Sequence, residues 1–231
     1  MLKKKAIFIF ALVSFVFCMG LSAGDTASFV NLGFSPDGNT YIFGQYGVSS
    51  ANLRPWADMF IVDIQANNFI PGGRINYTDI SPISAGQDGF SALLHILSQN
   101  NSLIQRNNVD FNIQGKPVFL ALDDGRHGNT IEFRDFENNY SYRAVLVSTV
   151  EGQGENLRSS FYIDLDRTNP NGSRVTYRVG TPQLRRPLIE SYRIRQVIVN
   201  PQNTSMIMVI EMRQRQGDSF NIRYMVEAVR F

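Results

Sequence analysis

Short apolar and aromatic runs, bounded by Gly, Pro, Asn or Ser, recur along the whole chain. Several of them alternate, as in Tyr192-Arg-Ile-Arg-Gln-Val-Ile198, so that one face is apolar and the other polar. A half-buried antiparallel strand has this period of two. The pattern predicts strands over residues 27–34, 40–46, 58–64, 117–122, 130–136, 141–150, 160–166, 174–179, 188–199, 205–213 and 221–231.

One interval has a different period. Asp88-Gly-Phe-Ser-Ala-Leu-Leu-His-Ile-Leu-Ser-Gln-Asn100 spaces its apolar residues as one face of a helix does, and residues 100–107 favour a second helical segment. The pattern therefore predicts a mainly β protein of antiparallel meanders, with a short helical insertion around residues 88–107. No linker or low-complexity stretch divides residues 24–231, so we expect a single domain there.

Two turns repeat each other. Ser35-Pro-Asp-Gly38 is typical of a type I turn, and apolar runs on both sides predict a hairpin. Val199-Asn-Pro-Gln-Asn-Thr-Ser-Met-Ile-Met208 aligns without a gap on Phe34-Ser-Pro-Asp-Gly-Asn-Thr-Tyr-Ile-Phe43. We expect Pro36 and Pro201 to open equivalent hairpins in two copies of one meander.

The N-terminus predicts export. Lys3, Lys4 and Lys5 precede an apolar run over residues 6–19, and small residues follow, which is the pattern of a secretory signal peptide. We expect residues 1–23 to be removed and the mature protein to be secreted or periplasmic, with no transmembrane segment after cleavage. An uncleaved anchor and a lipid-modified Cys18 are the alternatives.

Cysteine content and charge limit the function classes. Cys18 is the only cysteine, so its removal with the signal peptide leaves no residue for disulfides or thiolate chemistry. The formal net charge of +2 includes the three signal lysines, and without them it is −1. A nucleic-acid partner calls for a basic domain and is not expected. Apart from Lys116, every remaining cation is an arginine, which we interpret as strand-face residues flanked by acids.

Two resemblances follow from these motifs. The hairpin Leu32-Gly-Phe-Ser-Pro-Asp-Gly38 and its following strand resemble the blades of TolB-type and WD-type β-propellers. With Phe60-Ile-Val-Asp63, Ser191-Tyr-Arg-Ile-Arg195 and Arg223-Tyr-Met-Val-Glu227, almost the whole mature chain resembles a bacterial family of secreted proteins, domain of unknown function 2259. That resemblance implies export and a β-rich fold, and it supplies no catalytic residues.

The sequence singles out no catalytic residues. His95 lies among leucines and isoleucine of the expected helix, and His127 lies in a polar loop. Neither has a nucleophile motif beside it. Four acids, Glu132, Asp135, Glu137 and Glu151, have no distinctive spacing. No cofactor is expected.

Calcium is the one metal with a candidate site. Asp164, Asp166, Asn169 and Asn171 supply oxygen ligands around a turn that ends at Gly172. Their spacing differs from that of an EF-hand loop, and no Glu closes it. A plain strand connection is the alternative reading, since turns use the same residue types.

These observations favour a non-enzymatic envelope protein that binds an envelope protein or glycan, or that scaffolds other proteins. The alternative is a hydrolase of cell-wall or glycan material that uses carboxylates. A long loop over residues 47–57 is expected to carry the partner surface, with Arg54 beside Trp56, the only tryptophan. In the alternative interpretation Trp56 folds back over the core.

Overall fold

The structure is a computed structural model that describes residues 24–122 and 128–231. The predicted signal peptide, with Cys18, and the loop residue His127 lie outside the described residues.

The strands form three antiparallel sheets. The N-terminal sheet has the order β1-β2-β3-β4 and consists of β1 (Ser28–Phe34), β2 (Thr40–Val48), β3 (Pro55–Asp63) and β4 (Asn68–Thr78). The central sheet has the order β13-β12-β11-β5 and consists of β5 (Lys116–Leu120), β11 (Ile189–Val199), β12 (Ser205–Gln216) and β13 (Ser219–Arg230). The outer sheet contains β6 (Thr130–Asp135), β7 (Tyr140–Glu151), β8 (Arg158–Thr168), β9 (Arg174–Val179) and β10 (Arg186–Pro187).

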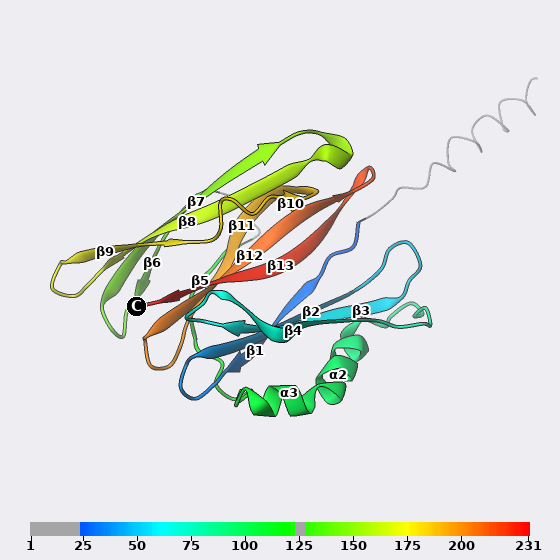
Figure 1. Ribbon diagram of the computed structural model, residues 1–231, viewed down its shortest axis with the longest axis horizontal. Coiled ribbons are helices and arrows are strands. Elements are labelled where there is room, and N and C mark those ends of the chain that lie inside the picture. Colours follow the sequence, from blue (N-terminus) through cyan, green and yellow to red (C-terminus); the bar gives the residue numbers. More distant parts are fainter. Residues whose placement is uncertain (1–23, 123–127) are drawn as a thin grey trace, which may run out of the picture.

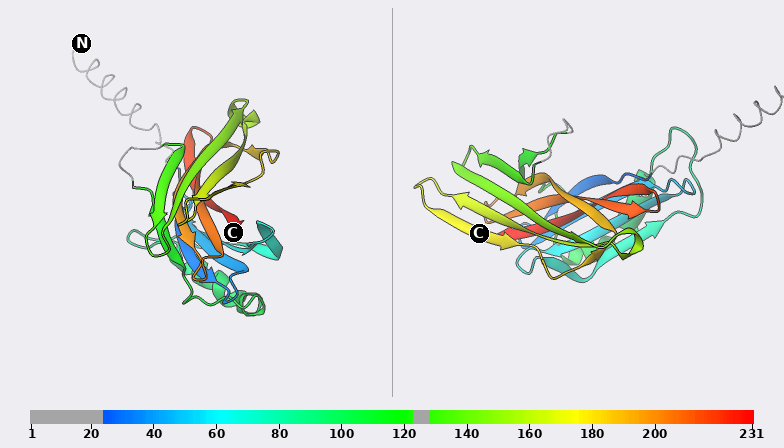
Figure 2. Two further views of the ribbon diagram at one scale, coloured as in Figure 1. Left: turned by 90° about the vertical axis from the view of Figure 1, so that its left-hand side faces the viewer. Right: turned by 90° about the horizontal axis from the view of Figure 1, so that it is seen from above.

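The sheets are stacked in layers, with the central sheet between the other two (Figures 1 and 2). Helices α2 (Phe90–Gln99) and α3 (Asn101–Arg106) cover the face of the N-terminal sheet that points away from the central sheet (Figure 1). A short 3-10 helix, Gly154–Asn156, joins β7 to β8. A sheet with both faces covered must be apolar on both faces.

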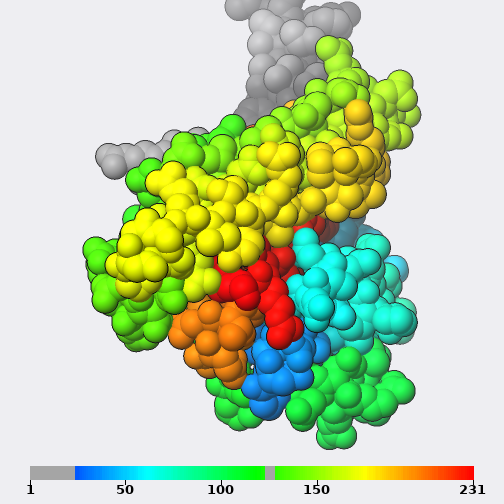
Figure 3. Space-filling model, turned by 60° about the vertical axis from the view of Figure 1, so that its left-hand side comes forward, coloured from blue at the N-terminus to red at the C-terminus, as the bar shows by residue number. Residues whose placement is uncertain are grey.

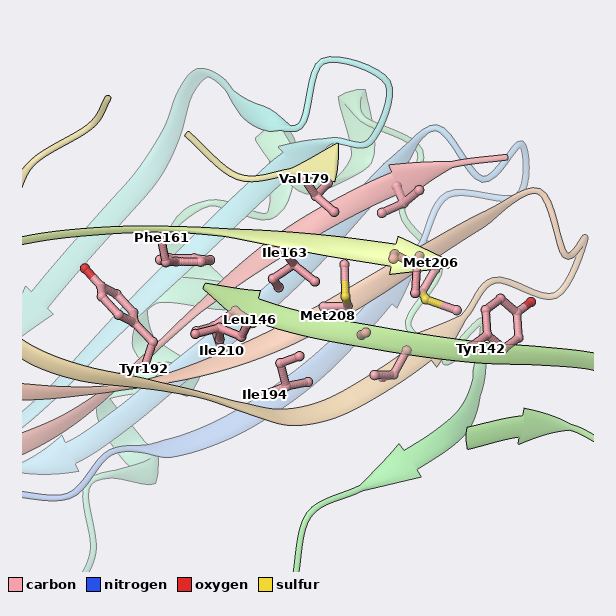
Figure 4. Close-up of a cluster of buried hydrophobic side chains, with 14 of the residues drawn as sticks. Tyr142, Leu146, Phe161, Ile163, Val179, Tyr192, Ile194, Met206, Met208 and Ile210 are labelled. Carbon is pink, nitrogen blue, oxygen red and sulfur yellow. The ribbon is translucent and has the colours of Figure 1, made fainter. Parts of the chain in front are cut away.

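Strand β12 shows this requirement most clearly. Met206, Met208 and Ile210 pack against the outer sheet, whereas Ile207 and Val209 pack against the N-terminal sheet, and all five are 0% exposed. Figure 4 shows the first of these clusters, between β7 and β8 and the strands of the central sheet. The unbroken apolar run of β12 is therefore the sequence signature of the middle layer.

The structure confirms the helical insertion that the spacing of apolar residues predicted. Ala92, Leu93 and Ile96 of α2 are buried against the N-terminal sheet, and Ile104 continues this face into α3. The helix begins at Phe90, with Gly89 as its N-cap residue, and Oδ1 of Asp88 accepts a hydrogen bond from the backbone N–H of Phe90 at 3.0 Å. An acidic acceptor here satisfies an N–H group that the first turn leaves without a helical partner.

The repeated turns are equivalent, as predicted. The backbone N–H of Ser35 donates to the carbonyl of Thr40 at 2.9 Å, and that of Asn200 donates to the carbonyl of Ser205 at 3.0 Å. The two turns also touch each other, because Nε2 of Gln202 donates to the carbonyl of Pro36 at 2.9 Å. The pseudo-repeat thus places two matching hairpins in stacked sheets.

Gly38 is expected to be intolerant of alanine. It has a φ of 68°, and an added Cβ would lie 2.4 Å from Nδ2 of buried Asn200. Gly172 has a similar φ of 84° but nothing within 4 Å, so it is the matched control. We expect Gly172→Ala to cost about 1 kcal/mol and Gly38→Ala about 3 kcal/mol in urea unfolding. Equal costs would show that the contact with Asn200 is unimportant.

Two expectations need correction, and a third is not confirmed. The sequence pattern did not predict β4, because Pro71-Gly72-Gly73 interrupts its apolar residues, and the structure places this segment at a register shift opposite β3. Strands β2 and β3 extend into the predicted long loop, so that only residues 49–54 connect them. The likeness to β-propellers is not confirmed, since the sheets stack in layers (Figure 2).

Candidate functional site: a groove at the edge of the central sheet

A groove of about 530 Å³ follows β13, the edge strand of the central sheet, where residues of all three sheets meet. One wall comes from β2, β3 and β4, and the other comes from residues 184–189, which include β10. In Figure 3, β4 (cyan) and the yellow-to-gold segment that runs from β9 to β10 lie on either side of the C-terminal part of β13 (red). The apolar part of the lining includes Phe43, Phe60, Phe69, Leu184, Met212 and Met225.

The period of β3 directs side chains into this groove. Ala57 and Met59 pack toward the helices, so their neighbours Asp58 and Phe60 face the central sheet. Arg74 of β4 lies directly opposite Phe60 in the ladder and therefore shares its face. An alternating strand thus brings an acid, an aromatic ring and a cation to one wall.

The edge of β13 is capped by two side-chain amides. Oε1 of Gln45 accepts a hydrogen bond from the backbone N–H of Tyr224 at 2.8 Å, and Oδ1 of Asn67 accepts one from that of Ala228 at 2.6 Å. Edge strands that keep open donors invite pairing with another chain. These amides occupy two donor positions of the edge and close it to a full added strand.

Asp58 is a half-buried acid in the groove. Burial raises the pKa of its carboxyl group, while a hydrogen bond from Nε2 of Gln45 at 2.9 Å and the charges of Arg223 and Arg74 act in the opposite direction. Gln45 therefore links this carboxyl group to the edge of β13.

Three arginines line the groove, and their surroundings differ. Arg223 donates to Oδ1 of Asp25 at 2.8 Å and stacks over the ring of Trp56 at 4.1 Å. Arg186 stacks on Phe161 at 4.9 Å, and its Nη1 is buried with no hydrogen-bond partner among the described residues.

Arg74 is the exposed cation of the three. Its guanidinium lies over the ring of Phe69 at 5.3 Å, and it forms no ion pair within the described part of the chain. Arg74 thus keeps exposed donors, and Arg186 keeps a buried donor that has no partner in the described structure.

Glu227 lies behind Arg186 and is 4% exposed. Its Oε2 accepts from Nδ2 of Asn67 at 2.5 Å, and its Oε1 is 4.0 Å from Nη2 of Arg186. Burial raises the pKa of this carboxyl group above 4.5, and the contacts with Asn67 and Arg186 only partly oppose that effect. Glu227 therefore connects the β3–β4 turn, β13 and β10.

Replacing Glu227 should change the pH dependence of stability. Because the folded-state pKa is raised, the native state binds more protons than the unfolded state above pH 4.5, and this carboxyl group destabilises the fold as the pH rises through that window. As the pH rises from 4.5 to the folded-state pKa of Glu227, we expect the unfolding free energy of the wild type to decrease relative to that of Glu227→Gln. Urea titrations across that range measure it, and a difference independent of pH would contradict the assignment.

The structure separates the two residues predicted to form a partner surface. Arg54 is exposed in the β2–β3 loop. Trp56 is 8% exposed in β3, and its Nε1 donates to Oδ2 of Asp25 at 2.9 Å. Trp56 thus packs as the alternative interpretation expects, and it contacts the groove through Arg223.

The four calcium candidates have separate partners. Oδ1 and Oδ2 of Asp164 accept from Arg178 at 2.7 and 3.0 Å, and Oδ1 of Asp166 accepts from the hydroxyl group of Thr176. Asn169 and Asn171 both hydrogen-bond to Ser173 within the β8–β9 turn. Within residues 24–122 and 128–231, no three His, Cys, Asp or Glu side chains gather as metal ligands would.

The acids considered for catalysis are engaged in ion pairs. Lys116 bridges Asp135 and Glu137, with both nitrogen–oxygen distances at 2.7 Å. Glu132 pairs with Arg143 and Glu151 with Arg185.

His95 is exposed on α2 and stacks on Tyr77, with ring centroids 4.2 Å apart. Among the described residues, the lining of the groove contains one acid, Asp58, and no histidine.

Sequence reasoning did not single out Gln45, Asp58, Arg74 or Arg186 as site residues. A signal was present for two of them, since Gln45 and Asp58 are polar residues that interrupt or begin otherwise apolar strands. Arg74 follows Pro71-Gly72-Gly73 in β4, a strand that the sequence pattern did not predict, and Arg186 belongs to a strand of only two residues. The pattern therefore did not show to which face of a sheet either side chain points.

A family model described as "Predicted secreted protein (DUF2259)" matches residues 42–230. The chain belongs to this family. The matched range includes every groove-lining residue, and the family description agrees with the predicted export. No curated protein matches the chain. Among the described residues, neither helix has the length and apolar character that a membrane span requires.

Proposed function

We propose that this secreted protein is a non-catalytic binding protein, and that its ligand occupies the groove along β13. The observation that carries the proposal is a groove of about 530 Å³ that combines apolar walls with unused arginine donors. Binding sites are typically concave, mostly apolar and equipped with a few oriented polar groups.

The contents of the groove favour binding over hydrolysis. General acid–base cleavage of a glycan uses two carboxyl groups on opposite sides of the scissile bond. Asp58 is the one carboxyl group among the described residues of the lining, and Gln45 and two arginines surround it. Arg54, on the β2–β3 loop, remains a candidate for contact with a protein partner.

Native mass spectrometry of the protein exported by its own host tests the proposal. We expect wild type to carry a bound molecule, seen as mass in excess of the mature chain. Leu184→Glu should remove this mass, because the charge enters the apolar wall. Leu53→Glu is the matched control, since Leu53 is 55% exposed and lies outside the groove, whereas Leu184 is 52% exposed. No excess mass in wild type, or equal retention in both variants, would overturn the proposal.

A further inference from the structure

The lining of the groove specifies a class of ligand, an inference that rests on the proposed binding function. The apolar contacts come from three segments of the fold: the β3–β4 hairpin, the loop before β10 and the β12–β13 hairpin. The residues that provide them are Phe60, Phe69, Leu184, Met212 and Met225. Methionine side chains adapt to ligands without a fixed shape, and phenylalanine rings give large apolar contact areas. These walls favour a flexible aliphatic body.

The charges of the groove favour an anionic head. Among the described residues of the lining are three arginines and one acid, Asp58, and burial raises the pKa of that acid. Behind the lining, Glu227 lies 4.0 Å from Arg186. Arg223 is occupied by Asp25, but Nη1 of Arg186 is buried without a partner in the described structure. A buried guanidinium N–H without an acceptor is costly, and a ligand oxygen would remove that cost. The planar guanidinium group matches the two oxygens of a carboxylate.

The size of the groove and its capped edge exclude an added peptide strand. A volume of about 530 Å³ is within the usual range for small-molecule sites, about 300–1,000 Å³. Strand addition needs the main-chain donors of the edge. Two of those donors, on Tyr224 and Ala228, already bind the amides of Gln45 and Asn67.

We infer that the groove binds a single-chain aliphatic carboxylate. Its head group lies at Arg74 and Arg186, and its chain lies against the apolar wall that includes Leu184 and Met225. Isothermal titration calorimetry with dodecanoate tests this inference directly. Dodecanol, which lacks the charge, and butanoate, which lacks the chain, are the matched probes.

We expect dodecanoate to bind at least about tenfold more tightly than either matched probe. Arg74→Gln and Arg186→Gln should each weaken dodecanoate binding about tenfold, the factor for one hydrogen bond to a charged group. Arg143→Gln is the control variant, because Arg143 pairs with Glu132 on the outer sheet, and it should bind as wild type does.

No binding of dodecanoate, or equal binding of dodecanol or butanoate, would overturn the inference. Wild-type affinity in both groove variants would also overturn it. A different molecule retained in native mass spectrometry would then leave the proposed binding function standing, so the two failures can be told apart.

Discussion

Replacing Trp56 by alanine is expected to lower the free energy of unfolding by about 3–5 kcal/mol. The indole is 8% exposed, donates to Asp25 and carries the guanidinium of Arg223 on its ring. Its loss leaves a cavity and removes the contacts that tie β3 to Asp25 and to Arg223 of β13. Urea unfolding of purified wild type and variant measures the effect.

Trp56→Phe is the conservative control. It keeps an aromatic ring under Arg223 but removes the hydrogen bond to Asp25 and part of the buried indole volume, so we expect a loss of about 2 kcal/mol, smaller than for alanine. If Trp56 instead faces a partner together with Arg54, Trp56→Ala would retain nearly wild-type stability and lose capture of that partner. The unfolding measurement distinguishes the two roles.

Replacing Phe161 by alanine, in a different layer from Trp56, is expected to lower the free energy of unfolding by about 3–5 kcal/mol. Phe161 is 1% exposed between the outer and central sheets, and its ring centroid lies 4.5 Å from that of Tyr192 (Figure 4). It also supports Arg186, so the variant should additionally weaken any ligand bound at the groove.

Its neighbour Tyr162 is the matched control. The strand period turns Tyr162 to the outer face, where it stacks with exposed Arg178 at 4.4 Å. We expect Tyr162→Ala to cost no more than about 1 kcal/mol. Similar losses in the two variants would contradict the assignment of Phe161 to the inter-sheet core.

Local patterns were sufficient to predict most of the elements. Alternation predicted the half-buried β11, a change of period predicted α2 and α3, and turn chemistry predicted the paired hairpins. Strand β4 was missed because Pro71-Gly72-Gly73 looks like a loop, and only the register shift opposite β3 lets this segment pair.

The groove could not be predicted in the same way. Its walls join β3 and β4 to residues 184–189 and to β13, which are far apart in the sequence. Alternation shows that Asp58 and Arg223 each occupy one face of a strand, but it does not show which layer that face meets. The stacking order of the three sheets decides it, and that order depends on long-range packing of residues such as Ile207 and Phe43.

Methionine-methyl NMR tests the central claim, that the groove is the binding site, most directly. Met212 and Met225 line the groove, whereas Met59, Met206 and Met208 are 0% exposed and lie outside its lining. During titration with dodecanoate, we predict that the Met212 and Met225 methyl signals shift in proportion to saturation and that the other three stay in place. Unchanged Met212 and Met225 signals at saturating dodecanoate, or shifts confined to the other three, would contradict the account.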